Sequence, residues 1–273
     1  MLTVAGSDPA GGAGIQADLR TLAALGVHGI SVLSALTVQD TARVYSVHPV
    51  DADLVRRQLE VVTADLAPAA TKTGLLATPG AIEAVAAARR AGRLGLLVVD
   101  PVLRASTGAD LTPAGADPAE MVSAYQQLLL PVTTVVTPNL EEAERLTGRR
   151  PGAVDGPEAM EDVALELVGA GPEVVVVTGG HLASDTGTVV DVVATASGVL
   201  RVPHPRVTTT NTHGTGCTFS AAMAAFLAQG QDAVSAAGAA GRFVGAALEG
   251  AAAWKLGTGP GPLDQAGAGG AGR

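Results

Sequence analysis

Short runs of apolar residues alternate along this chain with segments of helical periodicity, and no other feature of the sequence restricts the fold as strongly. A strand that is buried on both faces has a continuous apolar run, which is typical of a parallel sheet. Such runs predict strands over 2–5, 29–36, 70–75, 95–99, 133–136 and 173–177. Because helices are expected between most of them, we predict an α/β fold with a mostly parallel sheet covered on both faces.

Helix signals separate these strands, and capping residues mark some of the helix starts. Asp51 precedes a helix expected to end near Leu66, and Thr78-Pro79 has the cap and first-position proline of another. Further helices are expected after the glycines at 11–14, over 118–130 behind a loop with Ser106-Thr107-Gly108, over 140–146 and 158–168, after residue 217, and over 233–250.

The last third of the chain departs from this alternation. Two apolar runs, Thr188–Val193 and Val199–Val202, enclose a turn-forming segment and predict a β-hairpin. The segment from residue 265 to residue 273 is rich in glycine and alanine, and we expect it to be disordered. Residues 1–264 are therefore expected to form a single domain.

Charge and composition exclude several classes of protein. The 273 residues have a net charge of −9, which disfavours nucleic acid or an anionic membrane surface as the partner. A single cysteine cannot form an internal disulfide, and no apolar run approaches the roughly 18 residues of a membrane helix. The N-terminus resembles a first strand more than a signal peptide. We expect a cytoplasmic protein that acts on a small molecule.

Polar side chains follow several of the predicted strands, although they come from separate parts of the sequence. Ligands of parallel α/β sheets bind at the carboxyl ends of the strands, where such side chains converge. The residues found there are Gln39, Asp100, Asn139, Thr178 and the turn at 211–217. The pattern predicts one site assembled from five segments.

The turn Asn211-Thr212-His213-Gly214-Thr215-Gly216-Cys217-Thr218 runs directly into a strong helix former. The first backbone N–H groups of a helix lack intrahelical partners and lie at the positive end of its dipole, so they can bind an anion. A tight helix entry with close packing is the alternative explanation for the glycines. The polar strand ends favour the anion site, and we predict that a phosphoryl group is held here during its transfer.

Cys217 stands inside this turn, where a helix N-terminus is expected to lower the pKa of its thiol. A lone cysteine is more often a small buried apolar residue. Its place beside the glycines favours a chemical role, either as proton acceptor for a substrate hydroxyl or as a positioning group. The sequence has no matching His/Asn pattern of a cysteine hydrolase, which disfavours a covalent mechanism.

A second glycine-rich segment, Gly12-Ala13-Gly14-Ile15-Gln16-Ala17, follows the first strand and superficially matches a dinucleotide-binding fingerprint. The preceding Ser7-Asp8-Pro9 makes the turn longer than that motif requires, and the second strand does not end in an acidic residue. We expect instead that this loop lets the backbone approach a small substrate, with Asp18 one turn into the helix.

Two acidic residues lie where phosphate chemistry would need them. Asp100 precedes Pro101, so it could simply form a turn. The segment Asn139-Leu140-Glu141-Glu142 could be an ordinary helix start with Asn139 as its cap. Carboxylates at these strand ends would equally suit a Mg²⁺-bound phosphate. The sequence contains neither a zinc-binding His/Cys cluster nor a P-loop.

Taken together, the motifs resemble those of hydroxymethylpyrimidine/phosphomethylpyrimidine kinases, the thiamine-pathway branch of the ribokinase-like superfamily. The resemblance extends to about Gly261-Pro262 and implies a three-layer α/β/α sandwich with a small β-hairpin or flap. It rests on residues 5–18 (AGSDPAGGAGIQAD), 35–39 (ALTVQ), 71–76 (TKTGLL), 98–102 (VVDPV), 137–143 (TPNLEEA), 179–181 (GGH) and 211–218 (NTHGTGCT).

The resemblance implies ATP-dependent, Mg²⁺-requiring phosphorylation of 4-amino-5-hydroxymethyl-2-methylpyrimidine and then of its monophosphate, by a homodimer. A pyridoxal or pyridoxine kinase of the same fold is the nearest alternative, because its substrate is also a flat heteroaromatic ring with a hydroxymethyl group. A catalytically weak pyrimidine-binding homologue is the alternative from another class, and a nicotinamide-dependent enzyme comes third.

The resemblance also implies roles for individual residues. Gln39 would read the pyrimidine edge, Leu75 and Val102 would form walls for the ring, and the substrate site would include Gly11, Ala13 and Asp18. Gly214, Thr215, Gly216 and Cys217 would hold the transferring phosphoryl group, with Cys217 at the position of the catalytic Asp of sugar kinases. Asn139, Thr178, Thr212 and His213 would lie on the nucleotide side, and Asp100 and Glu142 would hold Mg²⁺ or its waters.

Two positions depart from the pattern of the family. Thr178 and Thr258 stand where many members have lysine, so two cations are missing near the phosphates. Lys72 and Lys255 are the candidates to compensate for them. Without compensation, the second phosphorylation is the step that the missing charges affect.

Overall fold

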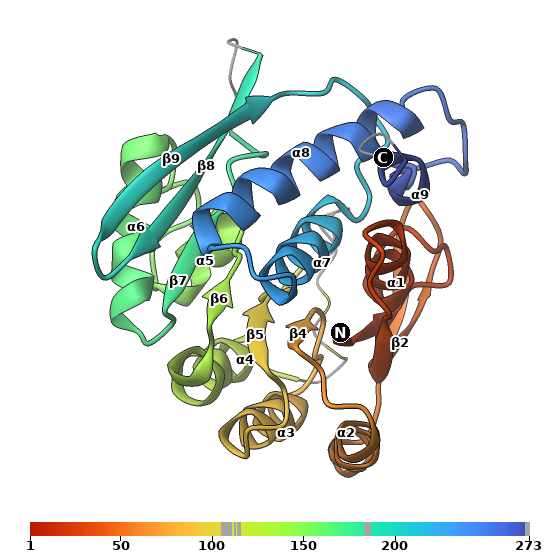
Figure 1. The fold of residues 1–273 in the computed structure, drawn as a ribbon, viewed down its shortest axis with the longest axis vertical. Helices are drawn as coiled ribbons and strands as arrows, with labels where there is room; N and C mark the ends of the chain where they lie inside the picture. Colours follow the sequence, from red (N-terminus) through yellow and green to blue (C-terminus); the bar gives the residue numbers. More distant parts are fainter. Residues whose placement is uncertain (105–110, 112, 114–115, 183–186, 271–273) are drawn as a thin grey trace.

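The computed structural model describes residues 1–104, 111, 113, 116–182 and 187–270, and the loop predicted at Ser106-Thr107-Gly108 lies outside them. Among the described residues, nine strands form one sheet in the order β3-β2-β1-β4-β5-β6-β7-β8-β9 (Figure 1). The parallel strands are β1 (Leu2–Ser7), β2 (Ile30–Gln39), β4 (Ala70–Thr73), β5 (Leu96–Val99), β6 (Val135–Val136) and β7 (Val174–Val177).

Antiparallel strands extend the sheet at both ends. β3 (Val44–Pro49) pairs with β2, which runs three residues beyond its predicted end because this partner continues its hydrogen bonding. At the other end, β8 (Thr188–Thr195) pairs with β7, and β9 (Gly198–Pro205) pairs with β8. The predicted hairpin therefore exists, but it continues the main sheet as its edge.

Helices cover both faces of the sheet, which confirms the predicted three-layer sandwich (Figure 1). One face packs against α2 (Ala52–Asp65), α3 (Pro79–Arg90), α4 (Pro118–Ala124), α5 (Leu140–Leu146) and α6 (Pro157–Gly169). The other face packs against α1 (Gly14–Ala24), α7 (Thr215–Ala228) and α8 (Ala233–Ala251). No helix in the described part of the chain is both long enough and apolar enough to cross a membrane.

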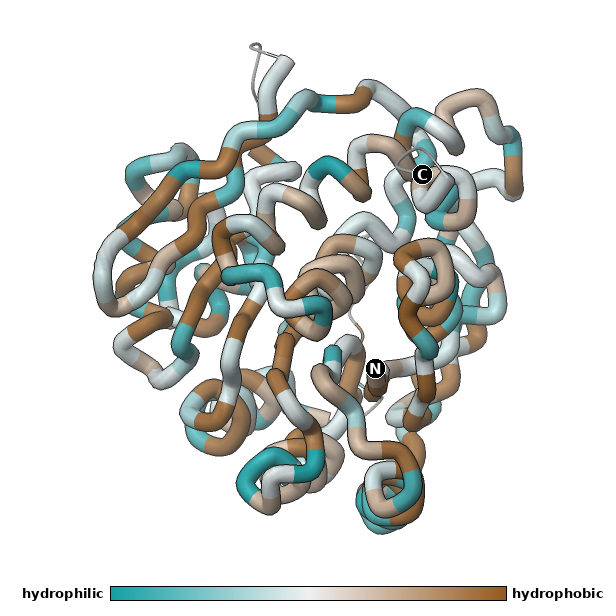
Figure 2. The backbone as a smooth tube through the Cα atoms, in the orientation of Figure 1, coloured by the Kyte–Doolittle hydropathy of each residue, from teal (hydrophilic) through white to brown (hydrophobic). Residues whose placement is uncertain are grey.

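Neighbouring residues of the central strands point into different cores. Val98 packs with α7 and α8, whereas Val99 packs with the helices of the opposite face. Such alternation requires apolar residues at consecutive positions, which is why these strands are continuous apolar runs. Figure 2 shows hydrophobic residues along the central strands and on the helices that cover them.

Local chemistry explains where several helices start. The side chain of Asp51 accepts hydrogen bonds from the amides of Asp53 and Leu54 at the start of α2, and Thr78 caps α3 through the Ala81 amide. Asn139 and Glu142 form a capping box at the start of α5, each accepting a hydrogen bond from the other's backbone. These caps agree with the helix starts predicted from the sequence.

The predicted helix over 118–130 is shorter than expected. α4 ends at Ala124 and is followed by a π-helical turn, Tyr125–Leu129, and a 3₁₀ turn, Leu130–Val132. Pro131 has no N–H group to donate, so the regular hydrogen-bond pattern cannot continue through it.

The tail also differs from its prediction, because residues 265–268 form helix α9. Gln265 is buried, and its side-chain amide donates to the hydroxyl of Thr218 in α7 at 3.1 Å. Gly269 lies directly against the backbone of Ala24 in α1. Composition suggested disorder, but small residues allow this segment to pack closely on α1 and α8, and disorder is wrong for residues 265–270.

Candidate active site

The carboxyl ends of the parallel strands bring together residues from distant parts of the sequence. Asp100 follows β5, Asn139 follows β6 and Thr178 follows β7, and a parallel β-bridge joins Asn139 to Thr178. The hydroxyl of Ser220 in α7 lies 3.0 Å from a carboxylate oxygen of Asp100, which joins the first turns of α7 to the end of β5. The strand ends and the glycine-rich turn therefore belong to one site.

The two glycine-rich turns pack against each other so closely that neither tolerates a side chain. Gly214 has φ +91°, and a Cβ on it would lie 1.9 Å from the carbonyl oxygen of Gly12. A Cβ on Gly12 would lie 2.2 Å from the ring of His213. These glycines therefore permit the contact that fixes the N-terminal loop beside the start of α7.

The N-terminus of α7 has the features of an anion site. Gly214 is its N-cap, and no side chain in the part of the chain that the structure describes caps the helix. Among the described residues, none accepts a hydrogen bond from the amides of Gly216 or Cys217, whereas the Thr215 amide donates to the carbonyl of Thr212. The two open amides lie at the positive end of a 14-residue helix, where a phosphate oxygen would be stabilised.

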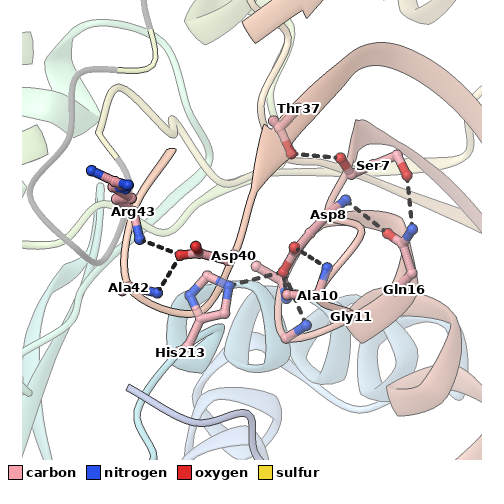
Figure 3. Close-up of polar contacts among 12 residues, drawn as sticks. Ser7, Asp8, Ala10, Gly11, Gln16, Thr37, Asp40, Ala42, Arg43 and His213 are labelled. Carbon is pink, nitrogen blue, oxygen red and sulfur yellow. Dashed lines mark hydrogen bonds and ion pairs between the residues drawn. The ribbon is translucent and has the colours of Figure 1, made fainter. Parts of the chain in front are cut away.

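A contact between Asp8 and His213 joins the two turns, as Figure 3 shows. The carboxylate of Asp8 accepts hydrogen bonds from the amides of Ala10, Gly12 and Ala13, and lies 2.9 Å from Nε2 of His213. Burial opposes the ionised carboxylate, but these hydrogen bonds outweigh burial and lower the pKa of Asp8.

The position of His213 differs from the nucleotide-binding role that the resemblance implied. Its side chain is buried and joins the two turns through Asp8, so it has a structural partner inside the protein. Thr212, by contrast, is exposed beside it. Sequence reasoning missed Asp8 as a site residue, although an acidic residue just before a run of glycines is the kind that caps their amides.

Asp18 also lies elsewhere than predicted. Its carboxylate is fully buried, 2.8 Å from Nζ of Lys72, and accepts a hydrogen bond from the hydroxyl of Thr3. This position excludes the substrate contact predicted for Asp18. Lys72 lies in a strand that was expected to be buried on both faces, and a charge at such a position was the available signal for a buried partner.

The predicted substrate positions surround the same strand ends. Leu75 and Val102 line the same small depression together with Leu103 and Met121, and at about 10 Å³ it does not hold a ring in the ligand-free protein. Gln39 is half-buried at the end of β2, and no residue that the structure describes is hydrogen-bonded to its side-chain amide. Gly11 and Ala13 lie in the N-terminal loop. The Arg20 guanidinium donates a 2.5 Å hydrogen bond to the Gly11 carbonyl, and the Ala13 amide donates one to the carboxylate of Asp8.

Asp100 and Glu142 form a buried pair of carboxylates. Burial and the charge of Asp100 raise the pKa of Glu142 well above its usual range, although the Asn139 amide donates to Glu142 at 2.9 Å. A carboxylate whose pKa is raised by a second carboxylate marks a natural place for a cation.

These residues fit a hydrated Mg²⁺ better than an enclosed metal cage. Among the described residues, no group of three or more His, Cys, Asp or Glu side chains could hold a metal ion. Mg²⁺ commonly keeps several waters and binds one or two carboxylates together with substrate phosphates. The buried hydroxyls of Thr73 and Tyr125 have no hydrogen-bond partner among the described residues, and Tyr125 senses the charges of both carboxylates. Hydroxyls in that state suit an ion that carries its own waters.

The pKa of Cys217 is the clearest correction to the sequence prediction. Desolvation, together with the charges of Asp100 and Asp18, raises the pKa of the thiol to about 12, although Lys72 and the Gly14 backbone oppose that shift. The helix N-terminus was expected to lower the pKa of the thiol. Burial and the two carboxylates, which are distant from Cys217 in the sequence, could not be predicted from the local pattern. The thiol is therefore protonated at neutral pH in the ligand-free protein.

The structure rules out one of the two candidates to replace the missing lysines. Lys72 is paired with Asp18 and its side chain is 1% exposed, so it cannot contact a phosphate. Lys255 is exposed in the loop near Thr258, whose amide donates to the hydroxyl of Thr41 in the β2–β3 turn. Arg206, which sequence reasoning missed, donates to the carbonyls of Gly180 and Leu182 in the loop after Thr178.

Residues 8–264 match the family model described as phosphomethylpyrimidine kinase. The chain belongs to the phosphomethylpyrimidine kinase family. The hydroxymethylpyrimidine/phosphomethylpyrimidine kinase of Rhizobium meliloti is 43% identical over 264 residues, which cover 96% of this chain and 95% of that relative. The thiamine biosynthesis bifunctional protein ThiED of Geobacter sulfurreducens is 43% identical over 264 residues, and this chain spans about half of it, 51%.

Solved structures with the same fold include kinases of two substrate classes. An ADP complex of Bacillus subtilis pyridoxal kinase superposes with a TM-score of 0.85 at 34% identity, covering 97% of this chain and 96% of that one. The phosphomethylpyrimidine kinase of Clostridium difficile 630 has a TM-score of 0.76 at 32% identity, with coverages of 90% and 98%. These similarities confirm the predicted ribokinase-like fold.

Proposed function

We propose that this member of the family transfers the γ-phosphoryl group of ATP to the hydroxymethyl group of 4-amino-5-hydroxymethyl-2-methylpyrimidine, and then phosphorylates the monophosphate to the diphosphate. One observation carries the proposal: the Ser220 hydroxyl links the α7 turn, with its open amides of Gly216 and Cys217, to Asp100 of the carboxylate pair. An anion site beside a cation site is the arrangement that phosphoryl transfer requires.

The chain's own residues act mainly by positioning. Leu75 and Val102 would hold the ring between them, and the free amide of Gln39 would donate to and accept from its edge. The amides of Gly216 and Cys217 would stabilise the charge on the transferring phosphoryl oxygens, because they are fixed before the reaction begins. Loose transition states of this kind demand little covalent chemistry from the protein.

Asp100 and Glu142 would hold Mg²⁺ through its waters, and when bound the ion neutralises charge on the phosphates. Asn139 and Thr178 would line the nucleotide side, with Arg206 fixing the loop that follows Thr178. Thr215 keeps the turn closed, since its hydroxyl donates to the Thr212 carbonyl at 2.7 Å.

Cys217 enters this mechanism as a thiol. With a pKa of about 12 the thiol keeps its own proton, so it would orient the substrate hydroxyl by hydrogen bonding and would not act as the base that accepts the hydroxyl proton. The role is therefore chiefly one of orientation, and it needs no thiolate before substrate binds.

Pyridoxal phosphorylation is the second candidate, and the superposition on the Bacillus subtilis pyridoxal kinase favours it. A competition assay separates the two: equal concentrations of the pyrimidine and of pyridoxal are incubated with ATP and Mg²⁺, and both products are quantified. Predominant pyrimidine phosphate supports our assignment, and pyridoxal phosphate alone refutes it. Pyrimidine binding without any phosphorylated product would point to a binding protein.

We also propose that the protein is a homodimer. Leu36 and Val38 on β2 and Tyr45 on β3 are 51%, 52% and 54% exposed at one edge of the sheet, where a partner would cover them. Analytical ultracentrifugation of the purified protein over a range of micromolar concentrations tests this proposal. A monomer at every concentration would refute it.

A further inference from the structure

Lys72 is a buried cation that the proposed chemistry does not yet use. It is one of only two lysines in a chain of 273 residues, and it lies in the centre of the sheet on β4 with no exposed surface. Its Nζ lies 2.8 Å and 3.0 Å from the two carboxylate oxygens of Asp18 and 3.9 Å from Oδ2 of Asp100. Burial opposes the charge, but these acidic neighbours outweigh it and raise the pKa of Lys72.

A buried ion pair is a weak source of stability, because the cost of removing two charges from water offsets their attraction. The consequence of this pair is therefore better sought in its electric field and in the groups it orients. Asp18 holds the ammonium from one side, and Thr3 donates to Asp18 and fixes that carboxylate in turn. The charge is thus anchored at a defined place under the strand ends.

Lys72 and Ser220 act on the same oxygen of Asp100. Oδ2 lies 3.9 Å from the ammonium and 3.0 Å from the Ser220 hydroxyl, whereas no described residue is hydrogen-bonded to Oδ1. The Ser220 hydroxyl also lies 2.9 Å from the Gly216 carbonyl, in the first turn of α7. A continuous series of contacts therefore runs from Asp18 through Lys72, Asp100 and Ser220 to the anion-binding turn.

We propose that Lys72 is a positioning residue of the phosphoryl-transfer site: anchored by Asp18, it turns Oδ2 of Asp100 inward, leaves Oδ1 for the cation, and adds positive potential beneath the amides of Gly216 and Cys217. This inference rests on the proposed function for its effect on catalysis. Its electrostatic part is independent of substrate, and the test uses that independence.

Cys217 is the only cysteine of the chain and is half-buried, so its alkylation by iodoacetamide reports the local potential without ATP, metal or substrate. The charge of Lys72 lowers the pKa of this thiol and that of Asp18 raises it. At pH 9 we expect Lys72→Met to slow alkylation by about 3- to 10-fold and Asp18→Asn to accelerate it by about the same factor. A merely structural pair would shift both variants in the same direction, which would overturn the proposal.

Activity gives the second readout. Lys72→Met is expected to lower kcat by about 100-fold with a change of at most about threefold in the KM of the pyrimidine, since the residue touches no substrate. The double variant Asp18→Asn/Lys72→Met removes both buried charges, which should restore the thermal midpoint and return alkylation to near the wild-type rate, because the two opposite shifts cancel, while kcat stays low. It also keeps the test valid if Lys72→Met alone does not fold. Lys255→Met is the matched control, a lost lysine charge outside the cluster, and should leave alkylation unchanged.

The outcomes separate this inference from the proposed function. If the wild-type protein has no kinase activity but the two single variants shift alkylation in opposite directions, the proposed function is refuted and the electrostatic role of Lys72 is supported. An active wild type with unchanged kcat in Lys72→Met and in the double variant would overturn the role of Lys72 and leave the proposed function standing.

Discussion

Replacing Gly214 by alanine tests whether the close contact between the two glycine-rich turns is needed for catalysis. An alanine at φ +91° costs about 1–2 kcal/mol of backbone strain. Its Cβ would also lie 1.9 Å from the Gly12 carbonyl oxygen, far inside the 3.0 Å that real Cβ atoms respect, so the turns have to separate. A displacement of about 1 Å in a positioned site lowers the rate on the order of 100-fold.

Gly230, just after α7, offers a matched control. It has φ +89°, but no atom lies within 4 Å of the Cβ it would gain, so Gly230→Ala carries the strain without the displacement. Both variants should lower the thermal midpoint by a few degrees, on the order of 2–4 °C per kcal/mol. Only Gly214→Ala should lose kcat/KM, measured by coupled release of ADP. Activity of Gly214→Ala within threefold of the Gly230→Ala value would refute the reasoning.

The structure predicts three further outcomes. Cys217→Ala should lower kcat by about 100-fold or more with little change in substrate KM, and an unchanged kcat in steady-state assays would remove its role. Asp191 accepts a hydrogen bond from the Gly179 amide, and its carboxylate lies 3.0 Å from Nε2 of His204. Burial and the positive charge of Arg206 lower the pKa of His204, but the Asp191 carboxylate outweighs both and raises it. A raised folded-state pKa gives stability below about pH 6.5 that disappears as the pH rises through the folded-state value. His204→Gln should therefore destabilise more at pH 6 than at pH 9 in urea unfolding, and equal losses would contradict the pairing. Gln265→Ala should cost about 1–2 kcal/mol by leaving the buried Thr218 hydroxyl unpaired, and an unchanged thermal midpoint would mean that α9 does not dock.

The sequence was most informative where structure depends on neighbouring residues. The caps at Asp51, Thr78 and Asn139 and the continuous apolar strands are local patterns, and each determined an element that the structure contains. The convergence of polar strand ends followed from topology alone, because parallel strands end at one edge of the sheet.

The sequence could not predict contacts between distant residues, because these contacts depend on which face of each helix or strand is buried. Asp18 and Lys72 are 54 positions apart and Asp8 and His213 are 205 apart, so only the packing of α1 and of the α7 turn reveals these pairs. The pKa of the Cys217 thiol was misjudged for the same reason, since it is raised first by burial and then by carboxylates in α1 and just after β5.

The tail shows the limit of composition as a guide. Glycine and alanine around residues 265–270 suggested disorder because they bury little apolar surface. In the structure, their small size is what allows Gly269 to lie against the backbone of Ala24. Close backbone packing of this kind leaves no hydrophobic pattern in a sequence.

The most direct test of the account is a time course of the reaction followed by ³¹P NMR, with ATP, Mg²⁺ and 4-amino-5-hydroxymethyl-2-methylpyrimidine. We predict that a phosphomonoester signal appears first and is then replaced by the two coupled signals of a diphosphate, while ADP accumulates. Persistence of ATP beside unmodified pyrimidine would contradict the assignment of this site to phosphoryl transfer.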